Sequence, residues 1–211
     1  MPFPIILAVA VVVLAAVAGA MVLRQKDPQR RAAALVRTAA VLMTAFTVLA
    51  AAFIGGEAMD QPGGMAGLVM ILTWLGPMLV LAALAWFWPA GTIPLLVALS
   101  AGLVAAGVWF ALDPAVARSL QDANGPVVAV GVVALAFPAA VLGLKRPNPA
   151  GWLLVGLGTL PLLITFLGRS GPAASLAAAS AVPLIAGITY LVAARLARRD
   201  PASRNTLPAS A

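Results

Sequence analysis

The sequence contains no cysteine and no histidine, and only 9% of its 211 residues carry a charge. Without cysteine, the chain cannot form disulfides, thiolate metal sites or a sulfur-linked lipid anchor. Without histidine, it lacks the usual protein ligand of haem, copper and zinc, and the commonest general base. These two absences exclude many classes of redox and metal-dependent enzyme.

Carboxylates are absent from the interior of the apolar stretches that make up most of the chain. An intramembrane aspartyl protease, a metal-assisted phosphatase or a carboxylate proton relay needs such groups within the membrane. Apart from Arg37, the polar residues inside these stretches are mainly serine and threonine, which commonly bond to their own helix or to a neighbouring one. The sequence therefore predicts that the protein is not an enzyme and takes no cofactor and no metal.

Apolar residues make up 63% of the chain, and the mean hydropathy is +1.07. A soluble domain is about 45–50% apolar and about 25% charged. The apolar residues form blocks close to the ~20 residues that a helix needs to cross a bilayer. These blocks lie at 4–23, 33–54, 65–88, 93–112, 126–144, 150–167 and 173–194. We predict an all-α polytopic membrane protein, with seven transmembrane helices in one domain over 1–199 and a short disordered cytoplasmic tail at 200–211.

Basic residues gather in alternate connecting segments. If the N-terminus lies outside the membrane, the segments on the inside hold Arg24, Lys26, Arg30, Arg31, Lys145, Arg146, Arg195, Arg198, Arg199 and Arg204. Positive charge favours the cytoplasmic side. The excess of arginine over lysine and the abundance of alanine are typical of a GC-rich bacterial genome. We therefore predict a multi-pass protein of the bacterial cytoplasmic membrane, with its N-terminus outside and its C-terminus cytoplasmic.

This charge pattern also indicates the partners. Apart from Arg37, the basic residues behind the net charge of +7 lie in the segments that flank the spans, where they set the orientation, so we expect no nucleic acid partner. The expected partners are the lipid bilayer, anionic headgroups at the cytoplasmic face, and other membrane protein subunits.

An internal repeat is suggested by two segments that align without a gap. "LAVAVVVLAAVAGAMVLRQKDP" at 7–28 and "VAVGVVALAFPAAVLGLKRPNP" at 128–149 share nine identical positions. The first and fifth spans would run in the same direction, which gives a 3+1+3 plan of parallel repeats like that of the SWEET sugar transporters. No family motif accompanies this likeness of architecture, and shared composition is the alternative explanation.

The span at 33–54 contains Arg37, a residue that is costly at the centre of a bilayer. At 100° per residue, the small and polar residues of this span share one face, and the bulky residues share the other. The first face comprises Ala33, Arg37, Ala40, Thr44, Thr47 and Ala51, and is predicted to pack against other helices. The second comprises Leu35, Leu42, Phe46, Leu49 and Phe53, and is predicted to face lipid. We predict that Arg37, Thr44 and Thr47 turn into the bundle, as a packing face or as the lining of a cytoplasmic vestibule. The alternative is that Arg37 only sets the orientation of the span.

Other residues indicate how the helices meet their surroundings. The amphipathic rings of Trp86, Trp88, Trp152 and Tyr190 are predicted to lie at the inner membrane interface. The glycines at 131, 156, 158 and 187 are predicted to be positions of close helix packing. Asp113 is predicted to cap a short surface helix in the segment "DPAVARSLQDANG".

Two functions fit these features. The first is a non-catalytic subunit, scaffold or assembly partner in a membrane complex. The second is an uncoupled transporter of a small solute or lipid, built on the 3+1+3 plan. A lipid-facing groove of small residues favours the first, and a polar cavity at mid-membrane favours the second.

Overall fold

The computed structural model describes residues 27–113, 115–116, 119, 127–167 and 173–198. In this part of the chain there are six α-helices, one π-helical turn and no strand. They are α2 (Pro28–Ala58), η1 (Met59–Gly63), α3 (Gly64–Phe87), α4 (Pro89–Leu112), α6 (Val127–Gly143), α7 (Pro147–Leu167) and α8 (Ala173–Arg198). The predicted spans from 33–54 onward coincide with these six helices, whereas the predicted span at 4–23 and the tail at 200–211 lie outside the described residues.

Five of these helices are long and apolar enough to cross a membrane, and α6 is a shorter apolar helix of 17 residues. Length and composition therefore agree with an all-helical, multi-pass membrane protein.

Local sequence sets the start of α2. The carboxylate of Asp27 accepts a hydrogen bond of 2.9 Å from the backbone N–H of Gln29, and Pro28 occupies the first helical position. An acidic cap satisfies a backbone donor that the helix cannot, and proline needs no such partner at this position.

Two different connections join α2 to α3 and α3 to α4. Gly63 and Gly64 have φ values of +72° and +55°, a conformation that glycine adopts without steric cost and that turns the chain into α3. At the other end of α3, Trp88 has a non-helical backbone (φ −131°, ψ 65°) before Pro89, which begins α4. A residue that precedes proline is driven out of the helical region, so the two apolar helices are separated there.

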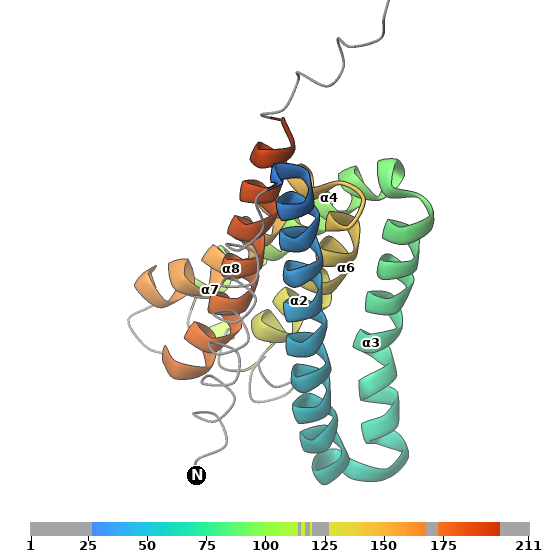
Figure 1. Cartoon of the computed structure of the whole chain (residues 1–211). Helices are drawn as coiled ribbons and strands as arrows, with labels where there is room; N and C mark the ends of the chain where they lie inside the picture. Colours follow the sequence, from blue (N-terminus) through green and yellow to red (C-terminus); the bar gives the residue numbers. More distant parts are fainter. Residues whose placement is uncertain (1–26, 114, 117–118, 120–126, 168–172, 199–211) are drawn as a thin grey trace, which may run out of the picture.

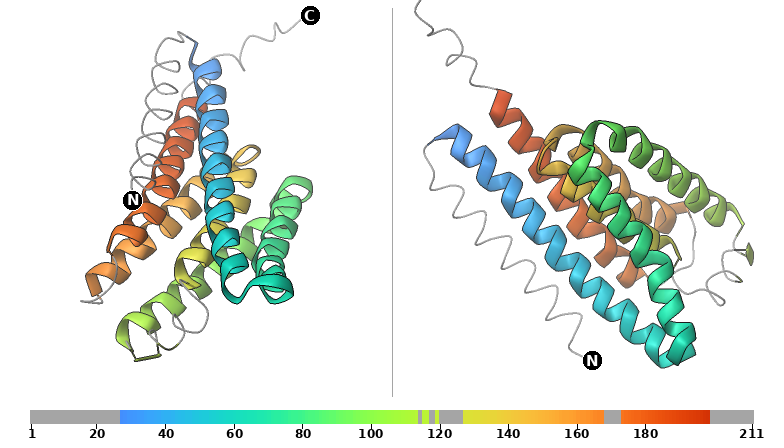
Figure 2. Two further views of the ribbon diagram at one scale, coloured as in Figure 1. Left: turned by 90° about the horizontal axis from the view of Figure 1, so that it is seen from below. Right: turned by 90° about the vertical axis from the view of Figure 1, so that its right-hand side faces the viewer.

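Successive helices run in alternating directions. As a result, α2 begins and α8 ends at the same end of the bundle, where the α3–α4 and α6–α7 connections also lie (Figure 1). Figure 2 shows α2 and α8 running alongside each other. In Figure 1, α3 stands at one edge of the bundle.

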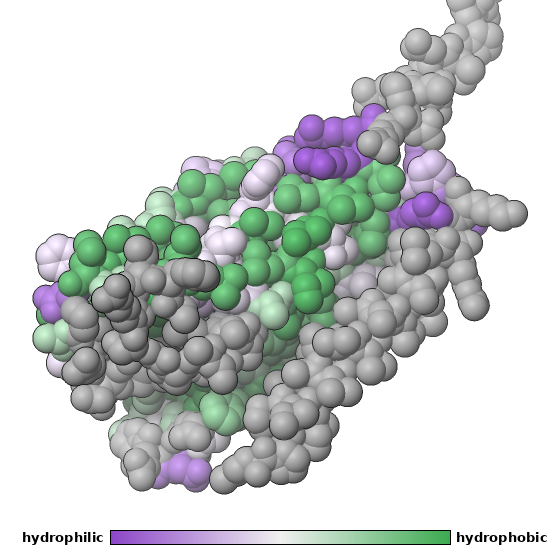
Figure 3. All heavy atoms as spheres, turned by 90° about the vertical axis from the view of Figure 1, so that its left-hand side faces the viewer, coloured by the Kyte–Doolittle hydropathy of each residue, from purple (hydrophilic) through white to green (hydrophobic). Residues whose placement is uncertain are grey.

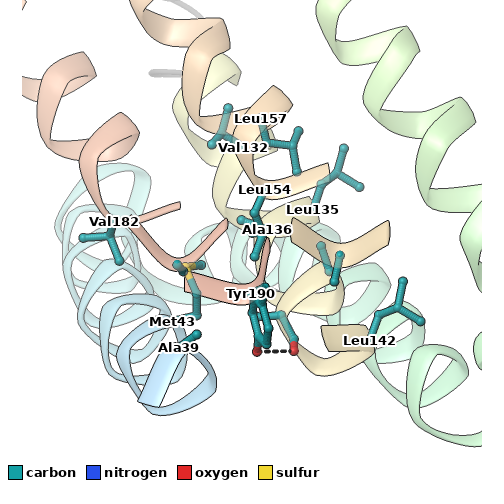
Figure 4. Close-up of a cluster of buried hydrophobic side chains, with 14 of the residues drawn as sticks. Ala39, Met43, Val132, Leu135, Ala136, Leu142, Leu154, Leu157, Val182 and Tyr190 are labelled. Carbon is teal, nitrogen blue, oxygen red and sulfur yellow. Dashed lines mark hydrogen bonds between the residues drawn. The ribbon is translucent and has the colours of Figure 1, made fainter. Parts of the chain in front are cut away.

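The core lies where α2, α6, α7 and α8 meet (Figure 4). Its largest fully buried side chains include Tyr190, Met43, Leu142, Leu154 and Leu157. Ten of the 17 residues of α6 are buried, whereas α4 buries three of its 24 residues. The central helix is therefore α6, and α4 lies at the periphery.

The most extensive helix–helix contact is that of α7 with α8, and it depends on glycine. A Cβ atom placed on Gly187 would lie 2.8 Å from the backbone nitrogen of Val155, and one on Gly158 would lie 2.9 Å from that of Leu184. The two backbones come this close because both side chains are absent. The predicted packing role of Gly158 and Gly187 is confirmed, as is that of Gly131, which lies against the side chain of Leu103.

The internal repeat is not confirmed. It pairs α2 and α3 with α7 and α8. Along α7 and α8 the contact is the most extensive of the described bundle, whereas α2 and α3 make far fewer contacts. Near their connection, Gly55 faces Ile71 and Gly67 faces Ala58. The two pairs therefore differ in how they pack.

Candidate functional site

The three residues predicted to share an inward face of α2 are separated by the structure. Thr47 is buried, with 4% of its surface exposed, whereas Arg37 and Thr44 are exposed. The hydroxyl of Thr44 donates a hydrogen bond of 2.8 Å to the carbonyl oxygen of Ala40 on its own helix. No vestibule lined by all three residues is present among the described residues, and the role of Arg37 stays a prediction.

The predicted division of α2 into two faces is wrong at Leu42 and Phe46. Leu42 is buried in the core, and Phe46 packs against it, although both were assigned to the lipid-facing side. Met43 and Ala39 are also buried (Figure 4), and at 100° per residue they lie on the same side of α2 as Leu42 and Phe46. The physical reason is that the bulky side chains of α2 pack against α6 and α8. The size of a side chain therefore did not distinguish the packed face of α2 from its exposed face.

Tyr190 was predicted at the membrane interface, but it is fully buried in the core. Trp86, Trp88 and Trp152 are exposed, as expected of interfacial rings. Asp113 acts as the predicted cap, since its carboxylate accepts hydrogen bonds from the backbone N–H groups of Ala115 and Val116 at 3.2 and 3.3 Å. Most of the surface helix predicted after it lies outside the described residues.

Among the residues that the structure describes, three buried polar atoms have no hydrogen-bond partner: Thr47 Oγ1, Trp74 Nε1 and Ser100 Oγ. An unpaired polar atom in an apolar environment is costly. They come from α2, α3 and α4, so each marks a different helix rather than one polar site. In the described part of the chain, no group of three or more acidic side chains that could hold a metal ion is present.

Six described basic residues gather at one end of the bundle, which we call the basic end. They are Arg30 and Arg31 on α2, Lys145 and Arg146 in the α6–α7 connection, and Arg195 and Arg198 on α8. Figure 3 shows the largest hydrophilic patch of the visible described surface at one end, with mostly apolar surface beside it. Asp27, whose carboxylate lies 3.6 Å from Nε of Arg30, is the acidic residue described at this end, while Asp60 in η1 and Asp113 after α4 lie at the other end.

Lys145 ties the α6–α7 connection to α3. Its ammonium donates a hydrogen bond to the carbonyl oxygen of Trp86 and lies 4.7 Å from the centre of the Trp86 ring. The last carbonyls of a helix have no intrahelical donor, and a cation there also interacts favourably with the helix dipole and with the aromatic face.

An open groove with a volume of about 350 Å³ lies between α4 and α7. Its lining is mainly apolar and includes several small residues. The lining residues are Val97, Ser100, Ala101, Val104, Pro149, Trp152, Leu153, Gly156 and Leu157. A Cβ atom on Gly156 would meet nothing within 4 Å, so the predicted close packing at this glycine is wrong. The missing side chain instead leaves the groove open.

A second surface of small residues lies on α4, which we call the small-residue face: Ala98, Gly102 and Ala105. All three are exposed, and their spacing of three to four residues places them on one side of the helix. The buried residues of α4 are Thr92, Leu96 and Gly107. At 100° per residue, the small-residue face points away from these buried positions, and therefore away from the bundle. A Cβ atom on Gly102 would meet nothing within 4 Å.

Comparisons with protein-family models, with curated proteins and with solved structures found no match. A functional assignment must therefore rest on these surfaces: the basic end, the groove and the small-residue face.

Proposed function

We propose that the protein is a non-catalytic subunit or assembly partner in a membrane complex, and that its small-residue face receives a transmembrane helix of another subunit. The observation that carries this proposal is the exposure of Ala98, Gly102 and Ala105 on a helix that buries three of its 24 residues. Lipid packs well against bulky side chains, whereas small residues let a second helix approach closely enough for backbone contact.

The orientation belongs to the same proposal. The basic end faces the cytoplasm of a bacterial cell, because an excess of arginine and lysine is retained on that side of the inner membrane. In this orientation α2 begins and α8 ends on the cytoplasmic side. An N-terminus outside then requires that 4–23 crosses the membrane, as the sequence predicts.

Site-directed cross-linking in native membranes tests the docking surface. The chain has no cysteine, so a single cysteine at Gly102 is the only thiol that a bifunctional reagent meets on this chain. We expect a discrete adduct with one membrane protein, and we expect Gly102→Leu to abolish its copurification. Gly76→Leu on α3 is the matched control, because a Cβ atom there also meets nothing within 4 Å.

Loss of the same partner in both leucine variants would indicate general damage and would contradict a docking role for α4. Retention in both variants would also contradict it. A single cysteine at Gly76 is the control for the cross-linking itself. A partner that is cross-linked from Gly102 but not from Gly76 is identified in the membrane, before any detergent extraction.

The alternative function is an uncoupled transporter of a small solute or lipid. The observation that favours it is that α2, α3 and α4 each bury one polar atom without a partner, on Thr47, Trp74 and Ser100, although these atoms do not form one polar site. Proteoliposomes with a fluorescent phosphatidylcholine test the lipid case. The assay measures how fast the labelled lipid moves between the two leaflets. Movement that depends on the protein, and that Thr47→Val slows, would favour this alternative over the subunit.

A further inference from the structure

We propose that the groove between α4 and α7, together with Arg146, forms a binding site for an anionic phospholipid. One acyl chain lies in the groove, and the phosphate is held at the basic end. This inference concerns a different surface from the small-residue face, so it stands independently of the proposed protein partner.

The groove has the shape that an acyl chain requires. Along α7 its lining extends from Pro149 to Leu157, which at 1.5 Å per residue is about 12 Å. The hydrocarbon of one leaflet is about half of the ~30 Å core, or about 15 Å. The groove therefore matches the depth of a single leaflet, and it is open at the side from which lipid approaches.

Charge selects the headgroup. Arg146 directly precedes α7, and its carbonyl oxygen accepts a hydrogen bond from the backbone N–H of Ala150. It therefore lies within one turn of Pro149, where the groove begins. The side chain of Arg146 is exposed and makes no hydrogen bond or ion pair with a described residue. A guanidinium in this position can hold a phosphate with two parallel hydrogen bonds.

The neighbours of Arg146 strengthen this preference. Lys145 adds a second positive charge beside it, and its ammonium is fixed at the end of α3 by Trp86. The acidic residue described at the basic end, Asp27, is paired with Arg30 on α2. The mouth of the groove is therefore positive, as expected of sites for anionic headgroups between transmembrane helices.

Trp152 marks the level of the headgroup. It lines the groove about one turn further along α7 than Pro149, and 61% of its surface is exposed. Tryptophan rings prefer the boundary between headgroups and hydrocarbon. The exposed ring of Trp152 therefore places the Pro149 end of the groove at this boundary. A phospholipid has its phosphate on one side of the boundary and its acyl chains on the other.

Native mass spectrometry of the purified full-length chain, titrated with phosphatidylglycerol or phosphatidylcholine, tests this site. We expect the wild-type chain to retain phosphatidylglycerol about fivefold more strongly, the effect of one basic residue at an anionic surface. Arg146→Gln should remove this preference, and Arg146→Lys should retain most of it. Gly156→Leu, which fills the groove, should lower the retention of phosphatidylglycerol by at least the same factor.

Two matched controls keep the test specific. Arg195→Gln removes a charge from the basic end but leaves α7 unchanged, and Gly76→Leu adds a side chain at an open position of α3. Both should bind as the wild type does. An equal loss in Arg195→Gln would show diffuse attraction to the basic end, and unchanged binding in Gly156→Leu would show that no chain enters the groove. Either result overturns the site.

Discussion

The hydroxyl of Tyr190 on α8 donates a hydrogen bond of 2.8 Å to the carbonyl oxygen of Ala140 on α6 (Figure 4). In a continued helix this carbonyl would accept from the N–H of Leu144, but that N–H donates to Val141 instead. The hydroxyl thus satisfies one of the carbonyls that the end of α6 leaves free. One buried side chain joins the central helix to α8.

Tyr190→Phe should lower the free energy of unfolding by about 1–3 kcal/mol, because it leaves a buried carbonyl without a donor. Thermal unfolding in a fixed detergent measures the change. Thr189→Val is the control on the same helix, since the hydroxyl of Thr189 bonds only to Ile185 one turn away. An equal loss in both variants would show that the contact between helices contributes nothing of its own.

Gly143→Ala should destabilise the protein by about 1–3 kcal/mol through overpacking. The new Cβ atom would lie 2.5 Å from the Cζ atom of Tyr190, whose ring is enclosed by the core. Gly156→Ala should instead be neutral or stabilising by up to about 1 kcal/mol, because alanine is the better helix former and the site is open. Thermal unfolding of both variants measures the contrast: the melting temperature should fall in Gly143→Ala and should stay the same or rise in Gly156→Ala.

Gly187→Ala should separate α7 from α8. The added carbon would lie 2.8 Å from the nitrogen of Val155 and 2.9 Å from the carbonyl oxygen of Gly151, and neither backbone atom can move without its helix. We expect a larger loss of stability than for Gly143→Ala, where a side chain is the obstacle. A cysteine pair across the two helices would report the separation as slower disulfide formation, and an unchanged rate would argue against it.

These contrasts show what the sequence can predict. The apolar blocks and the prolines and glycines between them located six helices to within a few residues. Gly156 and Gly187 look alike in the sequence, yet one borders an open groove and the other meets a backbone. Leu42 was misplaced for the same reason: which face of a helix is packed depends on where its neighbours lie, and periodicity alone does not contain that information.

Lys145→Gln should weaken the attachment of the α6–α7 connection to α3. It removes the cation that lies over the Trp86 ring and bonds to the Trp86 carbonyl. Because the side chain is exposed, the loss should be below about 1 kcal/mol. Lys145→Arg should retain most of the stability. Quenching of tryptophan fluorescence by acrylamide, a neutral quencher, should rise in the glutamine variant and stay near wild type in the arginine variant.

Single-cysteine labelling should settle which side the basic end faces. Asp60 and Gln29 lie at opposite ends of α2 and η1, and both are exposed. If the basic end is cytoplasmic, a cysteine at Asp60 should react with an impermeant maleimide in intact cells, and a cysteine at Gln29 should react only after lysis. Asn148, at the start of α7, should behave as Gln29 does, because the helices between them return the chain to the same end. The wild-type chain, which has no thiol, gives the background. Labelling of Gln29 and Asn148 but not Asp60 in intact cells would invert the orientation. Labelling of Gln29 and Asn148 on different sides would contradict the alternating path of the helices.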